Sequence, residues 1–297
     1  MSAGNHPMIQ SRGMSSSGDS VLRAMTDDGA FRVITARTTE TVRGAMAAQG
    51  ARGPTAKAFG ELLTGAILYR ETMAPQLRVQ GVLKGAAGSG NLVADSDPSG
   101  RTRGLVQVAQ GKQIALDGGA VIQFMRTLPG GRINQGIVAV PSSGGISAAL
   151  MAYMQDSEQV VSMISVSTLI EDDHIVGAGG YMVQLLPEVG RGPLLVMTER
   201  LRDFETIDAL VSDAAFSPEM LLSELLHGMP FTRLEESKVG YECWCDELRV
   251  VAAIATLSRE DIEHLLADGE VLEISCEYCR HEYRIPPVRL QGLLNES

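Results

Sequence analysis

Four cysteines in two close pairs near the C-terminus constrain this chain more than any other feature of its sequence. Cys243 and Cys245 are separated by one residue, Cys276 and Cys279 by two, and the spacer between the pairs is long enough for two short helices. Two such pairs, each on a turn, can place four sulfurs at the corners of a tetrahedron, about 2.3 Å from a zinc ion. The pattern predicts a metal site with all four cysteines as ligands, and four thiolates favour zinc over iron.

The same cysteines indicate sensitivity to oxidants. A metal-bound thiolate is deprotonated, and an oxidant attacks a thiolate far more readily than a neutral thiol. Sulfurs only one residue apart, as in Cys243-Trp244-Cys245, can also close into a strained disulfide once the metal has left. His281 is an alternative ligand, but four cysteines already complete a zinc shell, so we expect it outside the shell.

Composition places these cysteines in a reducing compartment. Four cysteines in 297 residues are too few for the disulfide scaffold of a secreted domain. Residues 1–20 lack the apolar core of a secretory signal, and no run approaches the roughly 20 apolar residues of a membrane span. We therefore expect a cytoplasmic protein with no membrane partner, and a disordered, Ser/Gly-rich N-terminus over residues 1–18.

Helix-like and strand-like segments alternate over residues 19–192. Helices are predicted at Thr39–Gln49, Ala56–Thr72 and Ile146–Asp156. Strands are predicted at Leu77–Leu83, Gly104–Ala109, Ala120–Arg126, Gln135–Val140, Val161–Val166 and Tyr181–Leu186. Strands separated by short turns, with two or three helices, favour an α+β core with an antiparallel sheet over a regular βαβ repeat.

Residues 193–240 are predicted to be a helical linker. Ser217-Pro218-Glu219 has the signature of a helix start, and Gly228 is a plausible stop. The helix between them is strongly apolar, through Met220, Leu221, Leu222, Leu225 and Leu226. This apolar stripe must lie against another part of the protein, and we expect the C-terminal segment to cover it.

The C-terminal segment, residues 241–297, is predicted to be a small zinc-binding domain. Helices are expected at Leu248–Leu257 and from Ser258 to Gly269, and strands on either side of Cys276 and Cys279, at Glu270–Ser275 and His281–Ile285. A unit this short is close to the size at which a domain needs a metal or disulfides to remain folded. Loss of zinc should therefore unfold it.

The cysteine pattern, together with many short motifs in a fixed order, resembles the redox-regulated heat-shock holdase family, whose members are also called chaperonins. The similarity runs from about Asp19 to Ile285. It is carried by Leu22-Arg23-Ala24, Phe31-Arg32-Val33, Gly60-Glu61-Leu62-Leu63, Arg103-Gly104, Gln135-Gly136-Ile137-Val138, Tyr153 with Ser157-Glu158-Gln159, and Ala178-Gly179-Gly180 with Gln184 and Leu186-Pro187. Two departures are a longer polar start and Leu105, where an aromatic residue is usual.

The resemblance implies a chaperone rather than an enzyme, with an α+β core, a metastable linker and a C-terminal zinc domain holding one zinc per chain. In this family the reduced, zinc-bound form is inactive. Oxidation releases zinc, forms disulfides that correspond here to Cys243–Cys245 and Cys276–Cys279, and unfolds the zinc domain and linker. The exposed surface then binds unfolding client proteins without ATP, and a homodimer of the oxidised form is left open.

A zinc ribbon that binds nucleic acid or a protein partner constitutively is the main alternative. Nucleic-acid binding requires a basic face, whereas the C-terminal segment has 5 Lys and Arg against 12 Asp and Glu, and the chain has a net charge of −11. A metal-dependent enzyme would need an open ligand position, which four thiolates do not leave. The sequence thus argues against a nucleic-acid partner and favours a redox-regulated holdase.

Overall fold

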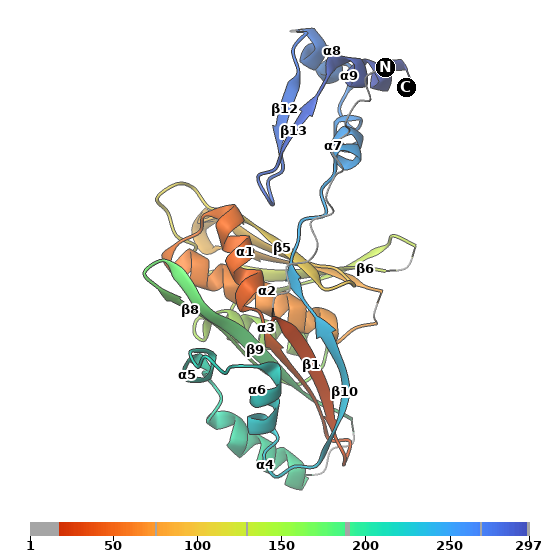
Figure 1. Ribbon diagram of the computed structural model, residues 1–297. Coiled ribbons are helices and arrows are strands. Elements are labelled where there is room, and N and C mark those ends of the chain that lie inside the picture. The colour runs from red at the N-terminus through yellow and green to blue at the C-terminus, as the bar shows by residue number, and fades with distance from the viewer. Residues whose placement is uncertain (1–17, 75, 129, 188–190, 268, 296–297) are drawn as a thin grey trace, which may run out of the picture.

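The computed structural model describes residues 18–74, 76–128, 130–187, 191–267 and 269–295. Residues 1–17 of the predicted disordered N-terminus lie outside the described residues. The architecture is the predicted mixed α+β fold, with two antiparallel sheets, three helices between them and a C-terminal segment that projects from the core (Figure 1).

The first sheet contains five antiparallel strands. Their order is β10 (Phe231–Lys238), β1 (Ser20–Thr26), β2 (Phe31–Arg37), β9 (His174–Leu185) and β8 (Ser162–Glu171). Side chains alternate between the two faces of a strand, so neighbouring residues of β2 contribute to two different cores. Ile34 packs into the large core between the sheets, and Val33 packs into a second core on the outer face.

The second sheet contains six strands. Their order is β11 (Gly240–Tyr241), β5 (Arg101–Gln107), β4 (Asn91–Ser96), β3 (Arg78–Lys84), β6 (Val121–Thr127) and β7 (Ile133–Ala139), with a 3₁₀ turn at Ala86–Gly88 between β3 and β4. All pairs are antiparallel except β11 with β5, which is parallel. The short strand β11 therefore brings the chain just before the first cysteine pair onto the edge of this sheet.

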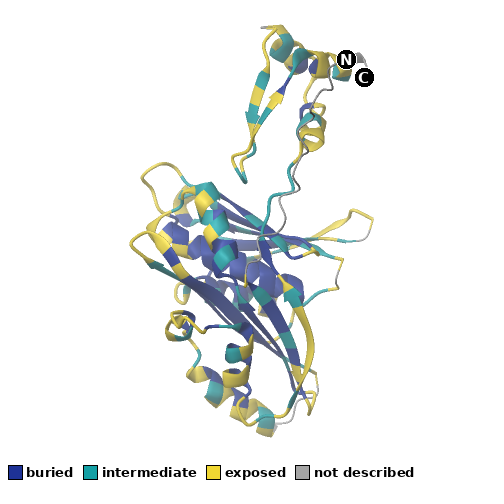
Figure 2. Ribbon diagram, viewed as in Figure 1, coloured by how far each residue is buried: buried dark blue, intermediate teal, exposed yellow. Residues whose placement is uncertain are grey.

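Three helices fill the space between the sheets: α1 (Thr39–Gln49), α2 (Gly53–Glu71) and α3 (Gly145–Asp156). Each contacts strands of both sheets, and α2 is buried along almost its whole length (Figure 2). On α1, a Cβ at Gly44 would lie 2.6 Å from Cβ of Tyr241, so only glycine lets β11 approach this closely. The helix layer thus also positions the entry to the C-terminal segment.

The predicted linker region contains three helices and a strand. Helices α4 (Arg191–Arg202), α5 (Asp208–Val211) and α6 (Pro218–Leu225) lie over the outer face of the first sheet. Helix α6 begins as predicted, with the N–H of Met220 donating to Ser217 Oγ at 3.1 Å. After the predicted stop at Gly228 the region is not helical, because β10 pairs with β1 along its whole length. The functional division of the chain at residues 193 and 241 remains a prediction.

The C-terminal segment has its own small core. It contains α7 (Glu247–Ile254), α8 (Arg259–Ala267), the hairpin of β12 (Leu272–Ser275) and β13 (Glu282–Ile285), and α9 (Pro287–Asn295). The buried side chains of this core are Ile254, Ile262, Ile285 and Leu290. Most of the other described residues of this segment are exposed or half-buried (Figure 2). Such a core is small for independent stability.

None of the helices in the described residues is both long and apolar enough to cross a membrane.

A buried carboxyl group in the core is expected to make stability depend on pH. Glu61 of α2 is 9 % exposed, and burial raises its pKa to about 7. Lys57, with Nζ 3.9 Å from the carboxylate, acts in the opposite direction, while Asp208 of α5 raises the pKa further. The native pKa of Glu61 lies above the ordinary value of 4.5, so the folded state is stabilised by protonation of this carboxyl group. That stabilisation is complete below pH 4.5 and is lost as the pH rises through 7.

The substitution Glu61→Gln should therefore raise the free energy of unfolding at pH 8 by roughly 1–3 kcal/mol and change it little at pH 5, because glutamine mimics the protonated acid. Urea unfolding of both proteins at the two pH values measures this difference. Glu199→Gln, at a carboxylate of α4 that is 66 % exposed, serves as the control. Equal effects of Glu61→Gln on the free energy of unfolding at pH 5 and pH 8 would contradict the raised pKa of Glu61.

Candidate metal centre

The four cysteines come from two segments that meet between the core and the C-terminal segment. Cys243 and Cys245 lie in the extended stretch between β11 and α7, and Cys276 and Cys279 lie in the turn between β12 and β13. In that turn the N–H of Cys276 donates to the carbonyl oxygen of His281 at 2.8 Å, and Arg280, at φ 60°, adopts the left-handed conformation that closes it. The predicted strand–turn–strand around the second pair is confirmed.

All four Sγ atoms lie within 4.8 Å of one another. The Sγ atoms of Cys243 and Cys276 are 3.8 Å apart, and those of Cys245 and Cys279 are 3.4 Å apart. Sulfurs about 2.3 Å from a central zinc in a tetrahedron would be about 3.8 Å apart, so the spacing suits such an ion. Among the described residues, no other group of His, Cys, Asp and Glu gathers ligand atoms in this way.

The alternative ligand His281 does not join this group. Its side chain is exposed, and its ring packs edge-on against Tyr283 with the ring centroids 4.7 Å apart. Its backbone takes part in the turn instead: the carbonyl oxygen accepts from the N–H of Cys276, and the N–H donates to the Cys279 sulfur. The arrangement therefore presents four sulfur donors, the set that zinc favours.

The surroundings of the sulfurs differ in their effect on thiol acidity. Burial raises the pKa of Cys245 and Cys279. The hydrogen bond that Tyr283 Oη donates to Cys245 Sγ at 3.0 Å acts in the opposite direction and lowers the pKa of Cys245. For Cys276 burial is again the largest influence, yet its pKa is lowered because the N–H groups of Tyr278 and Cys279 donate to its sulfur. A hairpin turn that aims backbone N–H groups at a thiolate is well suited to holding a metal ion.

Side chains of the core also reach the cysteine group. Arg103 of β5 donates from Nη1 to Cys243 Sγ at 3.3 Å. Gln49, the last residue of α1, donates from Nε2 to the carbonyl oxygens of Glu277 and Tyr278 at 2.8 and 2.9 Å. No signal in the sequence pointed to Gln49 or Tyr283, and Arg103 was visible only as part of the Arg103-Gly104 motif. Arg103 thus attaches the first cysteine pair to the core, and Gln49 attaches the turn of the second pair.

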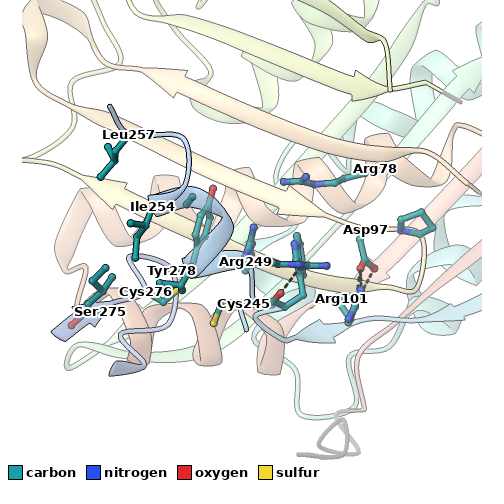
Figure 3. A pocket seen from close by; sticks show the side chains of 16 residues that line it. Arg78, Asp97, Arg101, Cys245, Arg249, Ile254, Leu257, Ser275, Cys276 and Tyr278 are labelled. Carbon is teal, nitrogen blue, oxygen red and sulfur yellow. Dashed lines mark hydrogen bonds and ion pairs between the residues drawn. The ribbon is translucent and has the colours of Figure 1, made fainter. Parts of the chain in front are cut away.

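A cleft of about 930 Å³ opens between the core and the C-terminal segment, beside the metal centre (Figure 3). Its core wall carries Arg78 and Arg101, and its far wall is the apolar face of α7, including Ile254. Cys245 and Cys276 also line the cleft. Two of the four sulfur-bearing residues are thus reached from this cleft.

The apolar stripe of the linker lies elsewhere. Leu221, Leu222, Leu225 and Leu226 are at most 1 % exposed, and Met220 is half-buried beside them. They pack on the outer face of β1 and β2, in the second core, and the expectation that the C-terminal segment covers them was wrong. The physical reason is β10, which follows α6 directly, pairs with β1 and carries the chain away to the other sheet before the first cysteine.

The fold is a mixed α+β core joined to a small C-terminal segment at a compact group of four cysteines that could hold a metal ion. The model of the Hsp33 protein family matches residues 19–286. The chain therefore belongs to the Hsp33 family, and the family defines it as a chaperone.

The similar proteins cover nearly the whole chain. The 33 kDa chaperonin of Syntrophotalea carbinolica is 28 % identical over 287 residues, which are 93 % of this chain and 99 % of the relative. That of Desulforamulus reducens is 27 % identical over 93 % of this chain and 97 % of its own. The crystal structure of the 33 kDa chaperonin of Thermotoga maritima, 22 % identical, superposes with a TM-score of 0.81 over 94 % of this chain and 98 % of that one, which shows the shared fold.

Proposed function

We propose that this chaperone is a redox-regulated holdase that works without ATP, inactive when reduced and zinc-bound and active after oxidation. The observation that carries the proposal is the gathering of four Sγ atoms within 4.8 Å at the junction of the core with a segment that has only a small core of its own. A metal bound there connects α7 to the β12–β13 hairpin. Its loss removes the strongest connection within the C-terminal segment.

Cys243, Cys245, Cys276 and Cys279 are the residues that would hold one zinc per chain. When bound, zinc keeps the four sulfurs as thiolates and links two segments that are distant in sequence. Two protein donors complement this negative charge: the guanidinium of Arg103 at Cys243 and the hydroxyl of Tyr283 at Cys245. The residues present therefore fit the metal in donor type, spacing and surroundings.

Oxidation by peroxide is proposed to form the bridges Cys243–Cys245 and Cys276–Cys279. For each bridge, two sulfurs lose two electrons and form an S–S bond, while one hydrogen peroxide accepts two electrons and two protons and becomes two waters. The close contacts in the folded form run between the pairs. Once the segment unfolds, the two sulfurs of one pair stay close, whereas sulfurs of different pairs separate, and this favours bridges within each pair.

Zinc binding contributes roughly 10–16 kcal/mol to the folding of small zinc peptides. Four buried side chains do not replace such a contribution, so release of the metal should unfold residues 241–297. We propose that the linker, residues 193–240, then loosens as well, because β10 is continuous with the chain that enters the metal centre. The apolar residues of α6 and the strands beneath it would then be exposed to partners.

The partners we propose are unfolding polypeptides, which expose apolar side chains that complement such a surface. The net charge of −7 over residues 241–297 disfavours nucleic acid as a partner. A reducing cytoplasm would keep the thiols ready to respond. Dimerisation of the oxidised form and constitutive binding of a protein partner are alternatives that activity assays can distinguish.

Peroxide with mild warming is expected to release one zinc per chain and to consume all four thiols. Release is followed with a chromogenic zinc indicator, thiols by alkylation, and bridges by mass spectrometry of the digested protein. Cys243–Cys245 and Cys276–Cys279 should be the main products, and untreated reduced protein is the control. Zinc content well below one per chain before treatment would contradict the metal assignment, and dominant bridges between the pairs would contradict the disulfide assignment.

A further inference from the structure

Arg103 of the core contacts an aromatic residue from each of the two cysteine-bearing segments. The guanidinium carbon of Arg103 lies 3.9 Å from the ring centroid of Trp244 and 4.0 Å from that of Tyr278. Trp244 separates the two cysteines of the first pair, and Tyr278 directly precedes Cys279. Stacking of a guanidinium on aromatic rings is favourable, and more so when water is excluded. We name this arrangement, of Arg103, Trp244 and Tyr278, the Arg103 sandwich.

The core holds this guanidinium in a fixed position. On the neighbouring strand β4, Asp95 faces Arg103 in the sheet register and is fully buried. Its Oδ2 lies 3.3 Å from Arg103 Nε, and its Oδ1 accepts a hydrogen bond from Arg78 Nε at 2.6 Å. The side chain of Arg103 is only 11 % exposed. Contacts within the sheet therefore orient the planar guanidinium independently of the C-terminal segment.

The same guanidinium responds to the chemical state of the cysteines. Arg103 Nη1 donates to Cys243 Sγ at 3.3 Å. Four thiolates around a divalent metal ion carry a net charge of −2, which the guanidinium partly balances, whereas two disulfides are neutral and accept hydrogen bonds weakly. The contact is thus strongest in the reduced, metal-bound form and is weakened by oxidation.

We propose that Arg103 is a positioning residue that keeps the reduced C-terminal segment docked on the core and thereby sets how readily oxidant releases the metal. This inference rests on the proposed redox-regulated function and assigns the residue that regulates its metal centre. Arg103 contacts both cysteine-bearing segments, so separating either one from the core requires breaking a cation–π contact. While docked, Arg103 also holds Cys243 through the hydrogen bond to its sulfur.

Two substitutions separate stacking from charge. Arg103→Met keeps the side-chain length but removes both the charge and the planar group, whereas Arg103→Lys keeps the charge beside Asp95 and loses the plane. Arg126→Met is the matched control, because Arg126 lies on β6 of the same sheet and pairs with Glu158 at 3.0 Å, away from the cysteines.

Trp244, the only tryptophan in the chain, reports docking directly. In reduced, zinc-loaded protein, both Arg103 variants should shift the Trp244 emission to longer wavelength and accelerate peroxide-induced zinc release about tenfold, because neither methionine nor lysine has the planar group that stacks on both rings. Arg126→Met should change neither quantity. Wild-type emission and release rate in both Arg103 variants would overturn the proposal, and wild-type behaviour of Arg103→Lys alone would overturn the role of stacking.

Tyr278→Leu keeps the proposal testable if substitution of Arg103 prevents folding, because it alters only one side of the sandwich. It should accelerate zinc release in the same direction, and an unchanged rate would overturn the proposal. These readouts use zinc and fluorescence alone. If wild-type protein fails to gain chaperone activity on oxidation, the proposed function fails; if wild type responds normally while the variants release zinc at its rate, only the role of Arg103 fails.

Discussion

The double substitution Cys276→Ser and Cys279→Ser is expected to give a protein that suppresses client aggregation without any oxidant. Removing two of four thiolates leaves too few ligands for tight zinc binding, and a segment with a core of four buried side chains then loses most of its folding energy. The zinc content should fall from one per chain to well below one. Light scattering of a thermally unfolding client, measured under reducing conditions, compares the activities.

Ser275→Ala in the same hairpin is the matched control, because Ser275 is exposed and adjacent to Cys276 without belonging to the sulfur group. It should retain both zinc and the inactive reduced state. A double variant that lacks zinc, has an unfolded C-terminal segment by amide exchange and yet remains inactive would show that unfolding of this segment does not activate the chaperone.

The double substitution Leu222→Ala and Leu225→Ala is expected to lower the temperature and the oxidant concentration needed for activation. Both leucines are fully buried, and they belong to the core that α6 forms with the first sheet. Each Leu→Ala change in such a position typically costs about 2–5 kcal/mol. The helix should separate from β1 and β2 more easily, which exposes the same apolar surface at a lower threshold.

Leu195→Ala is the control within the same region, since Leu195 of α4 is 66 % exposed. Thermal unfolding and client aggregation are followed together over a series of peroxide concentrations. A lower melting temperature with an unchanged activation threshold would mean that the linker stabilises the protein without taking part in its regulation.

The gathering of the four cysteines was predictable because the two members of each pair are close in sequence. Two short cysteine pairs indicate a candidate metal site through their spacing, whatever the remainder of the fold. The hairpin around Cys276 and Cys279 was also predicted, since apolar and polar residues alternate on both sides of the turn. Helices α1 and α2 followed from their composition and periodicity, with the start of α2 shifted to Gly53.

Features that depend on distant partners were not predictable in the same way. The sequence of β10, FTRLEESK, is largely polar and most of its side chains are exposed. It becomes a strand because β1, from the opposite end of the core sequence, offers a free edge, along which Arg23 and Glu235 form an ion pair. Strand β4 was missed for a related reason, since its buried Asp95 is stabilised by arginines of the neighbouring strands β3 and β5.

The surroundings of the cysteines also required the structure. Nothing in the sequence joins Arg103 to Trp244 or to Tyr278, which both lie much further along the chain. Only the parallel pairing of β11 with β5 places the first cysteine pair beside Arg103. The same path of the chain explains why α6 packs on the first sheet rather than against the C-terminal segment.

Client aggregation measured against the fraction of zinc released tests the central claim most directly. Reduced protein is treated with increasing peroxide, and zinc release and suppression of aggregation are determined in the same samples. The account predicts no suppression at full zinc occupancy and a rise in suppression that follows zinc release. Equal suppression by the reduced, fully zinc-loaded protein and by the oxidised protein would contradict the account and identify a constitutive binding protein.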